Sequence, residues 1–423
     1  MLHLVWDALK RTCYCMIAFL AFLVLVPNLP PYDMQYRGMN EPQVIPFTNG
    51  LSANHRLENA EHLSRSIVDS SLGYLKGPES FAIQEDYLYT GVQGGDVLRL
   101  NINDPKKPWE FVTKIGSSFC PDLQHEEVCG RILGLNFDTN QGHLLFLADA
   151  YYGLYKVNLK TQTKTALVPS NALIDGKRNV LTNSLVLSKD SKTIYYTVSS
   201  TNFPLHNGMY EVLTKPSGRL LKYDVYGNIS KVLMDDLSFA NGVTLSPNED
   251  FLLVCECGSS QIWRYWLKGD QRGQKEIFAR TPGCPDNIKP SEDGKYIVGI
   301  PVVHLPNQSS LIQKIVSNPI LAKVVVRLYC LLQTILEAFN THVTYLESFA
   351  VIIHRLGNTE HSGANMVQGY GLVIEFDSEG NIVQSWHSQD PSMSKICEGF
   401  LHNGYMYLGS PYNTFAARVP YYQ

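Results

Sequence analysis

The sequence predicts an all-β fold, a six-bladed β-propeller, with a transmembrane helix at its N-terminus and a helical insertion between blades 5 and 6. Three observations predict this fold: an uncharged apolar run near the N-terminus, 24 tyrosines among 423 residues, and a strand pattern that recurs six times. Tyrosine and β-branched residues favour strands. The formal net charge of −4 gives no basic field, so we expect no nucleic-acid partner.

The N-terminal segment has the features of a membrane anchor. Lys10 and Arg11 precede an uncharged run over residues 12–32, which as a helix would be ~30 Å long and match a bilayer core. The basic pair places residues 1–11 in the cytosol. We expect a single-pass type II membrane protein of the endoplasmic reticulum or plasma membrane, with a lumenal or extracellular propeller. A cleaved signal peptide is the alternative, although residues 26–30 offer no small-x-small cleavage site.

Cysteines and glycosylation sequons fit this topology. Cys120 and Cys129 flank a short loop and form the predicted disulfide, with metal binding by the pair as the alternative. Cys13 and Cys15 lie in the apolar run, where they are either lipidated or plain helix residues. No pairing is predicted for the remaining cysteines. Two sequons are typical of an exported glycoprotein: Asn228-Ile229-Ser230 and Asn307-Gln308-Ser309.

The repeat consists of a polar residue, a small residue, an alternating strand, a turn and a second strand. Its copies begin at residues 79, 133, 183, 241, 286 and 398. Such spacing suits four-stranded blades, so residues 73–423 would form the propeller and residues 33–72 a stem that includes its closure.

The long interval between the last two copies marks an insertion at about residues 301–368. Residues 311–339 have apolar positions three and four apart, as in a helix. Two interpretations are open: a helix packed on the propeller rim, or a lid or membrane-contacting helix. Charged residues interrupt the run, which disfavours a second transmembrane span.

The first residue of each repeat predicts a metal site. The six residues are Glu79, Leu133, Asn183, Asn241, Asp286 and Glu398. Because the innermost strands of a propeller line its axis, these positions would converge, and buried carboxylates need a partner. Calcium takes six to eight oxygen ligands, and the ring holds no His or Cys that would favour zinc. We predict calcium bound by Glu79, Asn183, Asn241 and Asp286. The alternative is that these residues only form turns.

Several short motifs are spread along the chain: Gly77-Pro78-Glu79-Ser80, Cys129-Gly130-Arg131 with Leu133-Gly134, Asp149-Ala150-Tyr151-Tyr152-Gly153-Leu154, Phe239-Ala240-Asn241-Gly242-Val243 and Pro285-Asp286-Asn287-Ile288. Together they resemble the strictosidine synthase-like family over nearly the whole chain. The wider superfamily includes paraoxonases and gluconolactonases, which hydrolyse aryl esters or lactones with calcium polarising the carbonyl. The resemblance implies the same four calcium ligands, with Asn287 adjacent.

Two departures limit what the resemblance implies. Leu133 stands where paraoxonases have a His, which removes a His-based proton relay. Strictosidine synthases carry a catalytic Glu near the position of Glu398, but the register differs by one residue, so amine–aldehyde condensation is not implied.

The first hypothesis is therefore a membrane-anchored, calcium-dependent arylesterase or lactonase that acts on a small ester or lactone. Glu398 is the candidate general base, because a carboxylate beside others has a raised pKa; a purely hydrogen-bonding role is the alternative. Arg131, Leu133 and Asn287 are expected to contact the substrate or support the site. The rival hypotheses are a non-catalytic propeller that binds a protein or lipid partner, and a strictosidine synthase-like condensing enzyme. The sequence predicts no particular protein partner.

Overall fold

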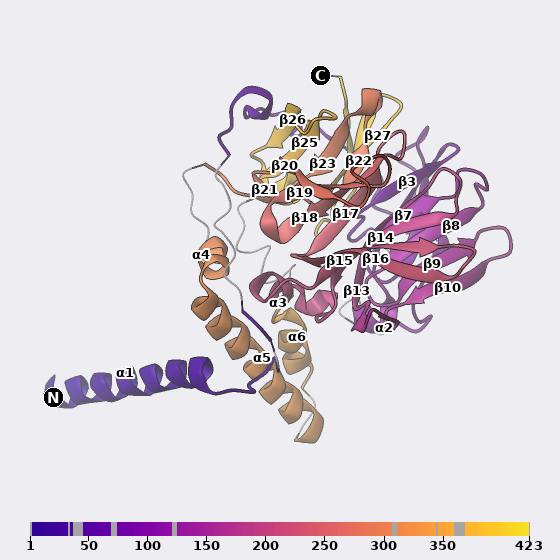
Figure 1. Cartoon of the computed structure of the whole chain (residues 1–423). Helices are drawn as coiled ribbons and strands as arrows, with labels where there is room; N and C mark the ends of the chain where they lie inside the picture. The colour runs from indigo at the N-terminus through magenta and orange to yellow at the C-terminus, as the bar shows by residue number, and fades with distance from the viewer. Residues whose placement is uncertain are drawn as a thin grey trace. The chain divides into compact units, whose positions relative to one another are not determined.

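The computed structural model describes residues 2–32, 34–36, 45–68, 74–120, 125–306, 311–343, 346–358 and 369–422. The chain divides into two compact units. The larger contains Pro42–Leu205, Pro216–Ser309 and Val367–Gln423, and the smaller contains Met1–Glu41, His206–Lys215 and Ser310–Met366. The larger unit is built from β-sheets and the smaller from helices (Figure 1).

Six sheets of four or five strands follow one another along the described part of the larger unit. The first three contain, in chain order, β2 (Ile67–Val68), β3 (Phe81–Gln84), β4 (Tyr87–Gly91), β5 (Asp96–Asn101) and β6 (Trp109–Lys114); β7 (Ile132–Phe137), β8 (Leu144–Asp149), β9 (Gly153–Asn158) and β10 (Thr163–Pro169); and β13 (Leu181–Leu187), β14 (Thr193–Ser200), β15 (Gly218–Asp224) and β16 (Ile229–Leu237). Apart from β2, which runs parallel to β6, their paired strands are antiparallel.

The remaining three sheets repeat this pattern. They contain β17 (Ala240–Leu245), β18 (Phe251–Glu256), β19 (Gln261–Trp266) and β20 (Lys275–Arg280); β22 (Ile288–Pro290), β23 (Tyr296–Gly299), β25 (Gly371–Phe376) and β26 (Ile382–Ser388); and β27 (Glu398–His402), β28 (Tyr405–Gly409), β29 (Ala417–Pro420) and β1 (Glu61–His62). Two-stranded sheets join β11 (Leu173–Ile174) to β12 (Lys177–Arg178), and β21 (Gly283–Cys284) to β24 (Val302–Val303).

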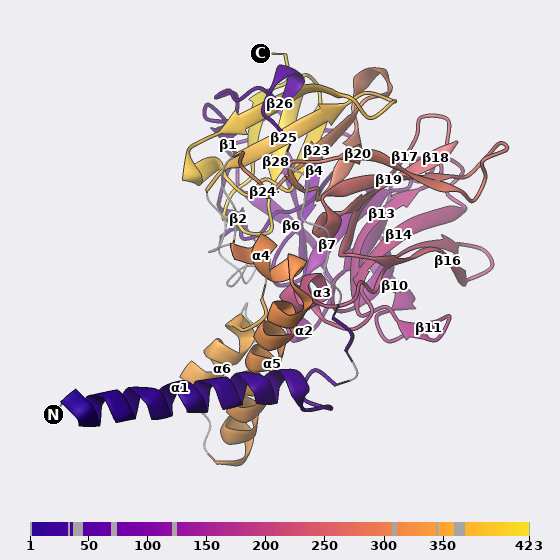
Figure 2. The ribbon, with the colours of Figure 1, turned by 60° about the vertical axis from the view of Figure 1, so that its left-hand side comes forward.

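The last sheet is completed by strand β1 from the other end of the chain. β1 pairs antiparallel with β29, with Glu61 opposite Arg418, and the two side chains form an ion pair of 2.8 Å. Figure 2 shows β1 on the same side of the unit as the C-terminal strands. The N-terminal and C-terminal parts of the larger unit are thus joined within one sheet.

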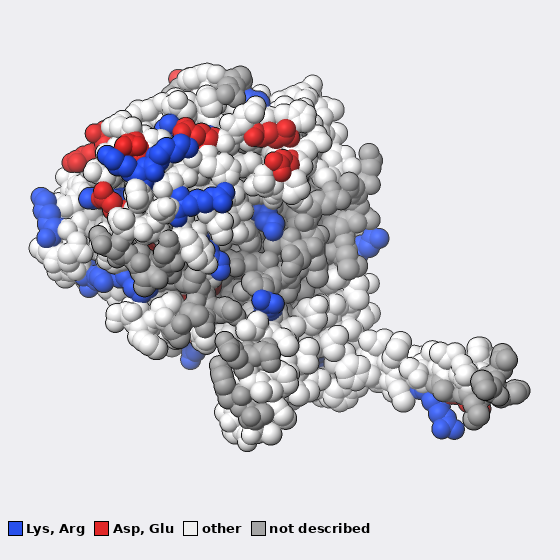
Figure 3. Space-filling model, turned by 180° about the vertical axis from the view of Figure 1, so that it is seen from behind, with Lys and Arg blue, Asp and Glu red and all other residues white. Residues whose placement is uncertain are grey.

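Strands β3, β7, β13, β17, β22 and β27 contact one another in turn. A hydrogen bond from the Phe81 N–H of β3 to the Glu398 side chain of β27 connects the first of these strands with the last. Second strands are buried on both faces: Leu145, Phe146, Leu147 and Ala148 of β8 are all inaccessible. Because successive side chains of a strand point to opposite faces, each sheet packs against a neighbour on either side. Figure 3 shows acidic and basic side chains mixed over one face of this unit.

The disulfide between Cys120 and Cys129 is confirmed. It joins α2 (Glu126–Cys129) to the segment after β6. Asn228 is exposed in a turn between β15 and β16, as a glycosylation site requires. The second sequon, at Asn307, lies outside the described residues.

The smaller unit contains α1 (Leu2–Leu25), α3 (Gly208–Leu213), α4 (Leu311–Ser317), α5 (Pro319–His342) and α6 (Glu347–Arg355). Two helices of the described chain are long and apolar enough to cross a membrane, at Val5–Leu25 and Pro319–His342. The sequence expectation extends the apolar helix to residue 32, but α1 ends at Leu25. Pro27, Pro30 and Pro31 explain this end, because proline lacks the N–H that a helix needs.

The helix expected over residues 311–339 is divided into α4 and α5. Asn318 lies between them, and its side chain accepts hydrogen bonds from the N–H groups of Ile320 and Leu321. With Pro319 at the first helical position, this is a standard N-terminal cap. The same two residues therefore end one helix and begin the next.

Candidate metal site at the centre of the sheets

The predicted ligand residues lie on or just before the ring strands. Glu79 precedes β3, Asn183 lies in β13, Asn241 in β17, and Asp286 precedes β22. The regular pairing of the first two strands is interrupted where Leu133, Asn183 and Asn241 lie. Such bulges turn side chains out of the normal alternation and are common beside functional sites. Three sheets thus share the same irregularity at the same repeat position.

Hydrogen bonds connect the ring residues from sheet to sheet. The Thr197 hydroxyl accepts from the Ser184 N–H (3.1 Å) and donates to the Asn241 carbonyl (2.6 Å). The Gly242 N–H donates to the Asp286 carbonyl (3.1 Å), and the Asn287 N–H donates to the Cys397 carbonyl (3.0 Å). Four sheets are therefore held together through the backbone of the candidate site.

Glycine permits this close approach. A Cβ on Gly242 would lie 2.6 Å from the Asp286 carbonyl oxygen and 2.7 Å from the Asn287 Cα. Gly134 stands equally close to the backbone of Asn183, and Gly409 to that of Glu79. Each of these contacts places a ring residue against the neighbouring sheet, so the small residue in the repeat has a packing function.

The four predicted ligands are buried: Glu79 is 3% exposed, Asn183 2%, Asn241 3% and Asp286 5%. The Oδ1 atoms of Asn183, Asn241 and Asp286 have no hydrogen-bond partner among the described residues. Buried acceptors of this kind are rare, because an unmet acceptor costs about 1–3 kcal/mol. Carboxylate and amide oxygens are the ligands that calcium prefers. The residues present therefore fit a calcium ion.

Asp286 occupies a strongly perturbed environment. Burial raises the pKa of its carboxyl to about 7; the Cys397 and Asn241 side chains oppose this rise, and the Glu398 charge adds to it. Burial also raises the pKa of the Cys397 thiol, with further contributions from Asp286, Glu79 and Glu398. These interactions bring the acidic side chains of three sheets into one neighbourhood, where they favour a cation.

Glu398 is inaccessible to solvent, and both of its carboxylate oxygens accept hydrogen bonds. Oε1 accepts from the Phe81 N–H (2.7 Å) and Oε2 from the Ser80 hydroxyl (2.7 Å). Lys289 Nζ lies 3.5 Å from Oε2. Burial raises the pKa of Glu398, while Lys289 and these hydrogen bonds lower it. The sequence reasoning missed Lys289, although it follows Asp286 by three residues on β22.

The three predicted supporting residues are buried in different surroundings. Leu133 is a buried apolar residue of β7, at the repeat position of the predicted ligands. Asn287 hydrogen-bonds through its backbone to Gly299 and Cys397. Arg131 donates through its side chain to the Pro411 carbonyl (2.9 Å), and its guanidinium lies 3.5 Å from Glu126. Arg131 thus connects the second sheet to the loop after β28.

Further cysteines near Asp286 were also missed. Cys257, in the 3₁₀ turn η3 (Cys257–Ser259), contacts Cys284 of β21, and this contact raises the pKa of the Cys257 thiol together with burial and the nearby Asp286. Only the position of Cys284, two residues before Asp286, was available as a signal in the sequence.

Comparisons with known proteins agree with these features. Two family profiles match, "Strictosidine synthase" over residues 183–270 and "Strictosidine synthase-like, N-terminal" over residues 51–100. The chain is 35% identical to adipocyte plasma membrane-associated protein Hemomucin of Drosophila melanogaster, over 97% of this chain and 69% of that protein. It is 32% identical to adipocyte plasma membrane-associated protein of Gallus gallus, over 92% of this chain and 84% of that protein.

Solved structures show the same fold at low identity. A gluconolactonase from Xanthomonas campestris superposes with a TM-score of 0.52 at 15% identity, covering 94% of this chain and 99% of the enzyme. A luciferin-regenerating enzyme gives a TM-score of 0.51 at 10% identity, covering 85% and 94%. At such identities the likeness concerns the fold alone.

Proposed function

The chain belongs to the adipocyte plasma membrane-associated protein family, and from that premise we propose that it is a membrane-anchored, calcium-dependent hydrolase of small esters or lactones. The proposed scaffold is a six-bladed β-propeller over residues 73–423, with an insertion at about residues 301–368. Support comes from six sheets whose first strands contact in turn and from β1, which completes the last sheet. Joining both ends of the chain in one sheet is how a propeller protects its edges.

One observation carries the calcium proposal: the buried, unpaired Oδ1 atoms of Asn183, Asn241 and Asp286 at equivalent repeat positions. With Glu79 as the fourth ligand, two carboxylates and two amides would hold the ion and leave positions for substrate or water. Calcium bound there would supply positive charge that stabilises negative charge developing on a carbonyl oxygen.

The chain's own residues have three proposed roles. Glu398 is the candidate general base, oriented by Ser80 and Phe81, and Lys289 supplies a nearby positive charge. Leu133 offers an apolar contact beside the ring, and Asn287 and Arg131 hold neighbouring backbone in place. Both carboxylate oxygens of Glu398 accept hydrogen bonds, so its alternative role is to position neighbouring residues. In that case the second candidate function is a non-catalytic propeller that binds a partner.

The proposed location is a type II membrane protein of the endoplasmic reticulum or plasma membrane, with the propeller outside the cytosol. α1 is apolar, Lys10 and Arg11 precede its apolar half, and the Asn228 sequon is exposed. The relatives are named for association with the plasma membrane.

The test is hydrolysis of a panel of aryl esters and lactones by the purified full chain in detergent. We expect activity that a calcium chelator abolishes and added calcium restores. Asp286→Asn should be inactive, whereas Asp250→Asn, half-exposed in the turn before β18, should behave as wild type. Activity that survives chelation would refute the calcium role, and no activity on any substrate would favour the partner-binding alternative.

A further inference from the structure

Helix α5 has an unusual distribution of side chains. A helix on the surface of a soluble protein buries its apolar face and exposes its charges. In α5 the buried residues include the polar Arg327 and Gln333. The exposed residues include Ile320 (63% exposed), Leu332 (40%) and Ile335 (57%). In α5, therefore, Arg327 and Gln333 are buried while several large apolar side chains are exposed.

Most of the exposed apolar residues form one continuous face. Its members are Leu321, Leu328, Leu332, Ile335 and Phe339, whereas the exposed Ile320, seven residues before Arg327, lies on another side of the helix. Leu328, Leu332, Ile335 and Phe339 follow at intervals of four, three and four residues, which places them along one side of a helix. The charged residues of α5, Lys323, Arg327 and Glu337, fall outside this side by the same periodicity. We call these five residues, Leu321, Leu328, Leu332, Ile335 and Phe339, the α5 apolar face.

The buried side of α5 is fixed by specific hydrogen bonds. The Tyr210 hydroxyl of α3 donates to Gln333 Oε1 (2.9 Å). Gln333 Nε2 donates to the Leu356 carbonyl that follows α6 (2.7 Å). These bonds fix the rotation of α5, so its apolar face cannot turn inward without breaking them.

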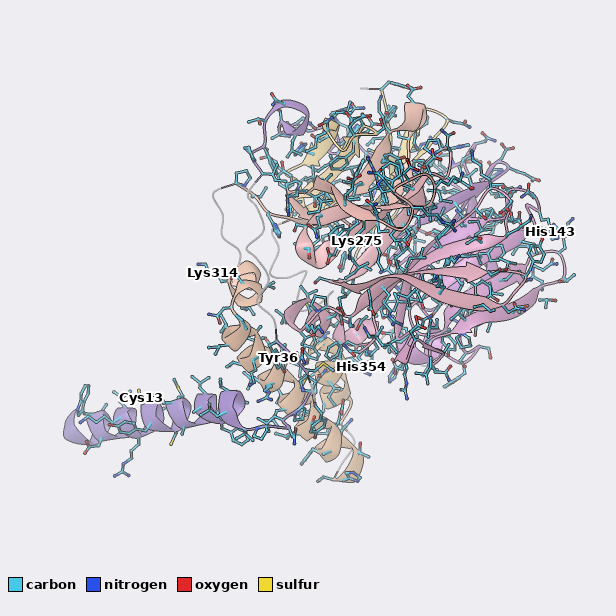
Figure 4. The ribbon with its side chains drawn as sticks, viewed as in Figure 1. Cys13, Tyr36, His143, Lys275, Lys314 and His354 are labelled. Atoms are coloured by element: carbon cyan, nitrogen blue, oxygen red, sulfur yellow. A yellow bond between two sulfur atoms is a disulfide. The ribbon has the colours of Figure 1, made fainter. Side chains whose placement is uncertain are left out.

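The buried side also contacts the end of the apolar helix α1. Arg327 donates to the carbonyls of Leu23 and Val26, at 2.8 Å each. The Leu23 carbonyl lies in the last turn of α1 and the Val26 carbonyl directly follows the helix, so neither has a further helical N–H to pair with. In Figures 1 and 2 the axes of α1 and α5 cross rather than run side by side. Figure 4 shows Tyr36, which follows α1, beside α5.

This geometry points to lipid as the occupant of the apolar face. If α1 spans the bilayer, its C-terminal end emerges at the membrane surface, and Arg327 holds α5 at that level. A helix lying across that end with an apolar outer side would sink its side chains about 5–10 Å into the headgroup and acyl boundary. Crossing the bilayer would instead place Arg327 within its apolar core, at a cost of about 2.5–3.5 kcal/mol or more.

We propose that α5 is an in-plane membrane helix whose apolar face dips into the same leaflet from which α1 emerges. The inference rests on the proposed membrane location of α1. It assigns the insertion to membrane contact and gives the chain a second, non-spanning attachment.

The test uses the full chain in phosphatidylcholine vesicles and in vesicles of the same lipid brominated on its acyl chains. Leu332→Trp and Ile335→Trp add a fluorophore to the apolar face, and Glu337→Trp adds one to another side of the same helix. The five native tryptophans give the same background emission in every variant, and the emission of wild type is subtracted to remove it. Because bromine quenches on contact, we expect the added emission of both apolar-face variants to fall roughly twofold or more, and that of Glu337→Trp to stay unchanged.

Flotation of the same vesicles separates the two membrane contacts. A chain that floats while both apolar-face variants resemble Glu337→Trp overturns the contact by α5 but leaves the α1 anchor intact. The apolar face would then belong to a protein partner. A chain that does not float with the vesicles overturns the anchor and the inference together.

Discussion

Asp286→Asn should raise the stability of the protein in the absence of calcium and reduce the stability that calcium adds. The Asp286 carboxyl is buried beside Glu398 and Cys397. Without a cation, burial and the negative charge of Glu398 both disfavour the ionised Asp286 carboxylate. Asparagine has nearly the same shape and no charge. The free energy of unfolding should therefore be higher for the variant than for wild type when calcium is absent. A gain of up to about 4 kcal/mol is expected near neutral pH, because burial raises the pKa of Asp286 from 3.8 to about 7 and each pKa unit corresponds to about 1.4 kcal/mol.

Calcium should stabilise wild type more than the variant and so oppose this gain. A ligand that binds only the folded state stabilises it by about 2.7 kcal/mol at a concentration of 100 times its dissociation constant. Asp286→Asn removes one of two charged ligands. Each tenfold loss of affinity removes about 1.4 kcal/mol of that stabilisation, so a hundredfold loss removes nearly all of it.

The assay is urea unfolding of the full chain in detergent, followed by tryptophan fluorescence, with chelator and with saturating calcium. Asp250→Asn is the matched control, because Asp250 is half-exposed in a turn of the same sheet. The reasoning is refuted if wild type does not respond to calcium, or if Asp286→Asn and wild type gain the same stability from it.

Three further predictions follow from buried groups of the larger unit. Glu398→Gln should lower the rate of ester hydrolysis by about 10²–10⁴-fold if the carboxylate is the base. A rate within a few-fold of wild type, with a free energy of unfolding lower by about 1–3 kcal/mol, would instead assign Glu398 to positioning. Gly242→Ala should lower the free energy of unfolding in urea by about 1–3 kcal/mol, because the new Cβ would meet only backbone atoms of the next sheet. Gly227→Ala, in an exposed turn, should leave it unchanged. Equal effects of the two substitutions would contradict the close approach of the sheets. Burial lowers the pKa of His387 from 6.5 to about 4, so the unfolded state binds the proton first as pH falls. Relative to a His387→Gln variant, the free energy of unfolding of wild type should therefore drop by about 2 kcal/mol between pH 7.5 and pH 5. An unfolding free energy that changes equally with pH in both proteins would contradict this source.

The repeat made much of the candidate site predictable from sequence. Equivalent positions of a repeat occupy equivalent places, so Glu79, Asn183, Asn241 and Asp286 could be chosen together although they lie far apart in the chain. The disulfide between Cys120 and Cys129 was predictable because the loop between them is short. Residues 33–72 are expected from sequence to include the closure, but β1 and β29 carry no repeat signal, so their pairing could not be identified from sequence.

Features that depend on contacts between side chains were not predictable. Lys289 is one residue on a short strand, and only the fold places it beside Glu398. The apolar periodicity of α5 was evident, but periodicity does not tell which side is buried. That depends on Arg327 and Gln333, whose partners are in other helices. The division of α4 from α5 could have been predicted, because Asn318-Pro319 is a helix-start signal, but one continuous helix was expected.

Equilibrium dialysis of the full chain against calcium tests the metal site most directly. We expect a single tightly bound ion per chain in wild type and in Asn248→Ala, whose side chain lies in an exposed turn. Asn241→Ala removes one of the unpaired buried oxygens and should weaken binding by about tenfold or more, since a lost ligand to a charged group costs about 1.5–3 kcal/mol. No bound calcium in wild type, or undiminished binding in Asn241→Ala, would contradict a calcium site at the centre of the sheets.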